Sequence, residues 1–161
     1  MNEDTKAKLD SMLMEALNAE AKANEFYADA SDKAESTAGK NLFKELADFE
    51  QGHYDRLKGF IEARNKGIKI GPYPLTKDMS GKAEVDGEFE PNKDEITRVL
   101  TIGIEAEKKA QAKYLEIAKM FEDATAKTIF QNLAEEERKH QNILEHQFYS
   151  MSNKGMIIWG D

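Results

Sequence analysis

The chain has 161 residues, of which 40% are hydrophobic and 34% charged, which suits a single domain with a sizeable core over residues 1–161. Because it contains no cysteine, disulfides, cysteine-bound zinc and iron–sulfur clusters are excluded. The net charge of −8 disfavours nucleic acid and anionic lipid as partners, and no stretch approaches the ~20 apolar residues of a membrane span. The charged N-terminus lacks a signal-peptide core, so we expect a cytoplasmic protein that binds neither nucleic acid nor membrane.

Proline and glycine divide the chain into two halves. All three prolines and four of the ten glycines lie between residues 66 and 92, and the rest is rich in strong helix formers. Apolar residues at steps of three and four predict helices over about 4–35, 37–65, 93–121 and 124–152, a crossover over 66–92 and a tail over 153–161. Ser36, Asn92 and Asp123 are the expected N-caps, with Glu95 completing a capping box after Asn92.

The two helical halves repeat each other at an offset of 87 residues. This offset superposes polar residues as well as apolar ones, which two unrelated hairpins would rarely share. The superposed polar pairs on the predicted inward faces are Glu20 with Glu107, Tyr27 with Tyr114, Glu50 with Glu137, and His53 with His140. We therefore predict a duplicated helical hairpin.

The length of the crossover determines how the two hairpins join. At ~3.3 Å per residue, the crossover of 27 residues could span roughly 90 Å, whereas a helix of about 28 residues is only about 42 Å long. The third helix can therefore start parallel to the second. The prediction is an all-α, four-helix bundle with one long crossover.

Four carboxylates and two imidazoles lie where the helices should be apolar: Glu20, Glu50, His53, Glu107, Glu137 and His140. Four clustered carboxylates without cations would be strongly destabilising, whereas two divalent metals would neutralise them. Each Glu-x-x-His pair places both side chains on one helical face, which is the arrangement found in ferritin-like di-metal bundles. Carboxylate and imidazole ligands favour iron(II) or manganese. The alternative is a bundle with incidental polar residues in its core.

Three segments carry a resemblance to a known family. NAEAKANEFYADAS resembles the first helix of rubrerythrins, and FEQGHYDRL and EEERKHQNIL resemble the Glu-x-x-His helices of the rubrerythrin/ferritin-like superfamily. The resemblance implies two iron ions, with manganese or a mixed pair also possible. It implies bridging roles for Glu50 and Glu137, terminal ligation by the other four residues, and hydrogen bonds from Tyr27 and Tyr114 to carboxylates.

The chain departs from rubrerythrins in two ways. It lacks the cysteines of their rubredoxin-like domain, and Ala110 stands where they carry an extra glutamate. We therefore expect a six-ligand di-iron oxidoreductase that reduces hydrogen peroxide or dioxygen with an external electron-transfer protein, as a homodimer. The alternatives are a ferroxidase in iron handling, a metal-binding sensor, or a helical interaction module.

Several remaining features have weaker implications. His146 is expected to face away from the site, and Glu105, Glu135 and Glu136 are expected to point off the inward face into solvent. The apolar tail segment 156–159 is expected to cover the end of the bundle or a dimer partner.

Overall fold

The computed structural model describes residues 1–69 and 87–160 and contains four helices in the order α1, α2, α3, α4. They span Glu3–Lys33, Thr37–Asn65, Lys93–Met120 and Ala124–Lys154, so each predicted end lies within two residues of the observed one. Most of the predicted crossover lies outside the described residues. Among the residues that are described, no helix combines the length and apolar character needed to cross a membrane.

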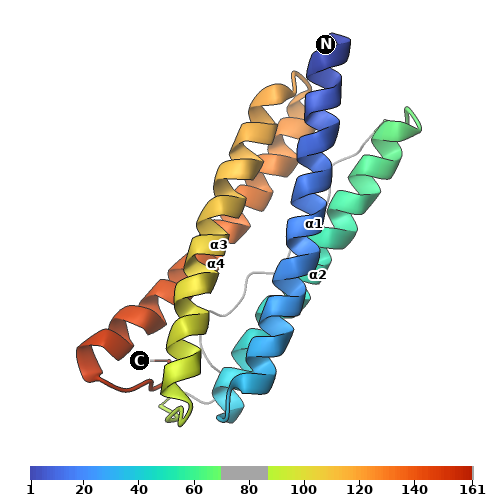
Figure 1. Ribbon diagram of the computed structural model, residues 1–161. Coiled ribbons are helices and arrows are strands. Elements are labelled where there is room, and N and C mark those ends of the chain that lie inside the picture. Colours follow the sequence, from blue (N-terminus) through green and yellow to red (C-terminus); the bar gives the residue numbers. More distant parts are fainter. Residues whose placement is uncertain (70–86, 161) are drawn as a thin grey trace.

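The helices form two antiparallel hairpins, α1 with α2 and α3 with α4, that pack side by side (Figure 1). Figure 1 also shows that α2 and α3 run in the same direction, as the crossover length predicted. The all-α four-helix bundle is therefore confirmed.

All three predicted residues stand at N-cap positions, and two of them cap their helix with a side-chain hydrogen bond. The Ser36 hydroxyl accepts a hydrogen bond from the Gly39 amide at 3.0 Å, and the Asp123 carboxylate accepts one from the Ala126 amide at 2.8 Å. The predicted capping box at Asn92 is wrong, because the Asn92 side chain makes no cap bond to α3. Its amide instead donates to the Lys33 carbonyl at 2.8 Å, which ties the start of α3 to the end of α1.

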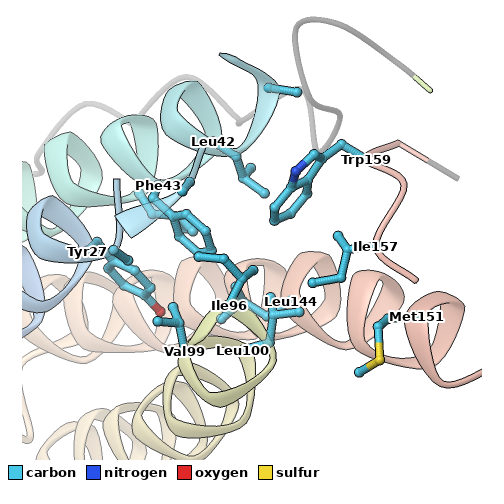
Figure 2. Packing of buried hydrophobic residues seen from close by; sticks show 14 of the residues in the cluster. Tyr27, Leu42, Phe43, Ile96, Val99, Leu100, Leu144, Met151, Ile157 and Trp159 are labelled. Atoms are coloured by element: carbon cyan, nitrogen blue, oxygen red, sulfur yellow. The ribbon is translucent and has the colours of Figure 1, made fainter. Parts of the chain in front are cut away.

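Two apolar clusters fill the bundle on either side of its middle. At the end shown in Figure 2, Trp159 of the C-terminal tail points toward Leu42 and Phe43. The indole is fully buried, and its ring meets that of Phe43 edge-on at 5.8 Å. The tail therefore covers the end of its own bundle, which is one of the two roles expected for it.

Glu90 joins this tail to the helix ends. Its buried carboxylate accepts hydrogen bonds from the Ser36 hydroxyl at 2.6 Å, the Asn92 backbone amide at 3.1 Å and the Trp159 indole at 3.3 Å. Burial opposes its ionisation, but these and other hydrogen bonds hold the pKa of Glu90 below its usual value. A Cβ atom at Gly39 would lie 2.7 Å from Glu90 Oε1, so a larger residue there would force this carboxylate to shift.

Candidate metal centre

The two apolar clusters are separated by a polar layer at mid-height in the bundle. All four helices contribute to it: α1 and α3 each supply one glutamate, and α2 and α4 each supply a Glu-x-x-His pair. Each of the six side chains is at most 3% exposed. The structure thus brings together all six residues singled out from the sequence: Glu20, Glu50, His53, Glu107, Glu137 and His140.

The six residues form two overlapping groups. One potential ligand atom from each member of a group lies within 4.8 Å of the others. The first group contains Glu20 and His53, the second contains Glu107 and His140, and both contain Glu50 and Glu137. A pair of carboxylates shared between two groups is the arrangement needed to bridge two cations.

The distances within the layer show how the shared carboxylates face both imidazoles. Glu50 turns Oε1 toward His140 Nδ1 at 3.1 Å and Oε2 toward His53 Nδ1 at 3.6 Å. Glu137 Oε1 lies 2.9 Å from His53 Nδ1 and 3.5 Å from His140 Nδ1. The imidazole rings are nearly parallel, with centroids 6.0 Å apart. Both histidines therefore direct the same ring nitrogen, Nδ1, into the space between the two groups.

In the absence of cations, the buried carboxyl and imidazole groups of this layer shift one another's pKa values, so that they hold protons in common. Burial raises the pKa of Glu20 and of Glu107, and the nearby charges of Glu50 and Glu137 raise it further. Burial opposes the ionisation of Glu50, but the neighbouring Glu20 carboxyl and the two imidazoles outweigh it and hold the pKa of Glu50 well below its usual value. Burial also opposes the charged form of the two imidazoles, but the surrounding carboxylates raise their pKa well above the usual value.

Unpaired atoms indicate what the layer can hold. Five buried side-chain atoms here have no hydrogen-bond partner: Glu20 Oε2, Glu50 Oε2, His53 Nδ1, Glu107 Oε2 and Glu137 Oε1. A buried polar atom without a partner costs ~1–3 kcal/mol, so one concentrated set of them indicates a missing ligand. Four of the five are carboxylate oxygens and the fifth is an imidazole nitrogen, which are the atom types that iron(II) and manganese(II) prefer as ligands. The residues present therefore fit two divalent cations.

Two tyrosines connect the hairpins through this layer. Tyr27 of α1 donates its hydroxyl to Glu107 Oε1 of α3 at 2.7 Å, and Tyr114 of α3 donates to Glu20 Oε1 of α1. Gly103 makes room for the first contact, since a Cβ atom there would lie 3.3 Å from the Tyr27 hydroxyl. Burial raises the pKa of both phenols well above the usual value, with the carboxylates adding to the effect. Both hydroxyls therefore remain protonated donors that orient one oxygen of each glutamate.

The expectation that Glu136 points into solvent is wrong. Its side chain is largely buried and accepts a hydrogen bond from His53 Nε2 at 2.6 Å. Arg56 donates to the same carboxylate oxygen at 2.7 Å. Because a carboxylate can only accept, His53 carries a proton on Nε2, which leaves Nδ1 available to a cation. The physical reason for the error is that Glu136 faces α2 across the interface between the hairpins.

The two histidines consequently differ in their surroundings. At the offset of 87, the position equivalent to Glu136 is Phe49. Phe49 packs edge-on against His140, with ring centroids 5.1 Å apart. The His53 imidazole is therefore hydrogen-bonded to a carboxylate that Arg56 also contacts, whereas the His140 imidazole packs against an aromatic ring. The duplicated site is symmetric in its six central residues but asymmetric around them.

The other flanking residues lie where the sequence analysis placed them. Glu105 and His146 are exposed. Glu135 is also exposed and pairs with Arg138 at 2.5 Å.

Comparisons with solved structures agree with this fold. A hypothetical protein from Pyrococcus furiosus is 23% identical and matches over 91% of this chain and 91% of its own, with a TM-score of 0.68. A proposed ferritin-like diiron-carboxylate protein from Thermotoga maritima is 20% identical and matches over 88% of this chain and 94% of its own, with a TM-score of 0.66. These likenesses show a shared ferritin-like fold.

The sequence comparisons identify the family. No curated protein sequence matches the chain. The Rubrerythrin family model matches residues 11–147, a span that contains the whole polar layer and both tyrosines. The chain therefore belongs to the rubrerythrin family.

Proposed function

We propose that the chain is a di-iron oxidoreductase that reduces hydrogen peroxide, or dioxygen, with electrons from a separate carrier protein. The observation that supports this most is that Glu50 and Glu137 belong to both ligand groups. Membership of the rubrerythrin family and the likeness to a protein described as a diiron-carboxylate protein point the same way.

In this proposal, each residue of the layer has a defined task. Glu50 and Glu137 would be shared by the two ions, Glu20 and His53 would complete one ligand set, and Glu107 and His140 would complete the other. Tyr27 and Tyr114 hold one oxygen of each terminal glutamate, so the opposite oxygen faces the ions. Bound iron would supply two electrons together to one substrate molecule. Reduction of peroxide then takes two electrons and two protons and gives two waters.

The source of these electrons must lie outside the chain. The sequence has no cysteine and no Gly-x-Gly-x-x-Gly motif, so neither an iron–sulfur centre nor that type of dinucleotide site can re-reduce the ions. We therefore expect the di-ferrous protein to react once with excess peroxide and then stop. Further turnovers should need an added electron carrier together with its reductase.

Two experiments test the proposal. In the first, anaerobic titration with iron(II) should saturate at about two ions per chain for the parent and for Glu135→Ala. Glu50→Ala should lose affinity for both ions, because a bridging carboxylate serves both. Saturation at one ion would contradict the shared site, and loading far above two would indicate iron storage.

The second experiment is stopped-flow mixing of di-ferrous protein with peroxide and, separately, with dioxygen. A single rapid oxidation by either one supports the oxidoreductase, and the faster reaction identifies its preferred oxidant. Absence of reaction with both would favour a metal-binding sensor instead. Sustained peroxide reduction with NADH alone would contradict the need for a carrier protein.

A further inference from the structure

A pocket of about 400 Å³ lies between α1 and α3 and reaches the polar layer. Its floor includes Glu20, Glu107 and Glu137, and its walls include Ala19 and Ala106, which are exposed at the surface. The pocket therefore extends from the surface of the bundle to side chains of the proposed metal centre. Its volume lies within the ~300–1,000 Å³ of pockets that bind small organic molecules. Peroxide or dioxygen, about the size of one or two waters at ~30 Å³ each, would fill only a small part of it.

Small apolar side chains create this space. Ala19, Ala23, Ala106 and Ala110 line the pocket in two pairs related by the offset of 87. Ala23 and Ala110 lie on the inward faces of their helices, yet both are only half-buried, because no larger side chain covers them. A row of alanine methyls offers apolar contact and no hydrogen bonds, so it favours an apolar chain or ring over a polar solute.

The two ends of the pocket differ in character. At one end, Lys113 pairs with Glu15 across the gap between the helices at 3.1 Å. The positions equivalent to these two by the offset of 87 are Phe26 and Ile102, which also line the pocket. The duplication therefore gives the pocket one charged end and one apolar end, and such a cavity distinguishes the two ends of an amphiphilic molecule.

The rim carries positive charge on a chain whose net charge is −8. Lys22 and Lys109 line the pocket from opposite helices, both are exposed, and within the described part of the chain neither pairs with a carboxylate. An anionic head would be attracted to this rim and repelled by the carboxylates of the floor. Its apolar tail would then extend along the alanines toward the apolar end formed by Phe26 and Ile102.

We infer that the α1–α3 pocket binds a small aliphatic carboxylate, with its head at Lys22 and Lys109 and its tail along the alanine walls. This inference names a class of ligand for the pocket beside the proposed metal centre. Only the link between this ligand and catalysis rests on the proposed function. The binding contacts all come from side chains of the chain itself, so binding can be measured without metal.

The test uses the full chain, metal-free and iron-loaded, with octanoate as the probe. Isotope labelling of alanine methyl groups should show octanoate-dependent NMR shifts at Ala19, Ala23, Ala106 and Ala110 and none at the exposed Ala28. Shifts confined to other alanines, or no binding of octanoate, would overturn the inference.

Variants then test the pocket and its charge by calorimetry. The double variant Ala19→Phe, Ala106→Phe should weaken octanoate binding at least about tenfold by filling the space, whereas Ala28→Phe should leave it unchanged. Lys22→Gln with Lys109→Gln should weaken octanoate binding by about two- to fivefold at low salt and should leave the binding of octyl alcohol unchanged. Circular dichroism and thermal unfolding verify that each variant folds.

The remaining outcomes are decisive as well. If the filled variant binds octanoate as well as the parent, or octylamine binds as tightly as octanoate, the inference is wrong. Sedimentation that shows a parent dimer broken by the filled variant would make the pocket an interface between two copies instead. An iron titration on the same samples distinguishes failure of this inference from failure of the proposed function. If the protein binds iron but not octanoate, the carboxylate pocket is wrong and the metal centre stands.

Discussion

Replacing Glu136 by glutamine should weaken metal binding at one position of the centre and spare the other. The Glu136 carboxylate holds His53 through a buried hydrogen bond of 2.6 Å and is itself held by Arg56. Hydrogen bonds to charged groups contribute ~1.5–3 kcal/mol. Loss of a carboxylate behind a ligating histidine typically costs ~10–100-fold in metal affinity, or ~1.4–2.7 kcal/mol. The two ranges agree, so we expect a loss of about 10–100-fold at the position served by Glu20 and His53.

The assay is an anaerobic competition titration of manganese(II) or iron(II) against a chelator, which resolves the two binding steps. Glu135→Gln is the matched control, because Glu135 is adjacent in sequence but exposed and paired with Arg138. The control should titrate like the parent. Two unchanged steps for Glu136→Gln, or two equally weakened ones, would refute the asymmetry between the His53 and His140 positions.

Three further predictions concern the polar layer, its two tyrosines and the C-terminal tail. The metal-free protein should become more stable toward urea unfolding as the pH falls from about 8 to about 5. The reason is that the folded state binds more protons than the unfolded chain, because folding raises the pKa values of four residues: Glu20, Glu107, His53 and His140. Below about pH 4.5 the stability should fall again, because the pKa of Glu50 is lowered in the folded state and its protonation favours unfolding. Equal stability at pH 8 and pH 5 would contradict a clustered site. Tyr27→Phe and Tyr114→Phe should each weaken one metal-binding step about tenfold, at opposite positions in the competition titration, since each hydroxyl orients a different terminal glutamate. Trp159→Ala should lower the free energy of urea unfolding by about 3–5 kcal/mol, because the indole is fully buried and donates to Glu90; a loss below about 1 kcal/mol would mean that the tail does not support the bundle end.

The duplication made much of the site predictable from sequence. Carboxylates and histidines on otherwise apolar faces, repeated at one offset, located the polar layer and the helices that carry it. The ends of helices could also be predicted where a side chain caps the helix locally, as at Ser36 and Asp123. Both kinds of signal depend on spacing within a helix, which the chain alone specifies.

Contacts between hairpins were harder to predict. Glu136 is next to the predicted ligand Glu137, and its phase on α4 alone did not show that it meets α2. The repeat contains a usable clue, because the equivalent position is the aromatic Phe49, whereas Glu135 corresponds to Asp48. Glu90 was missed for a different reason. Its hydrogen-bond donors come from three separate parts of the chain, and no periodicity connects them.

The most direct test of the metal centre is a crystal structure of protein loaded anaerobically with iron(II), with anomalous diffraction measured at the iron edge. We expect two anomalous peaks per chain. One should lie beside Glu20 and His53 Nδ1 and the other beside Glu107 and His140 Nδ1, both in contact with Glu50 and Glu137. A single peak, or two peaks that share neither Glu50 nor Glu137, would contradict this expectation.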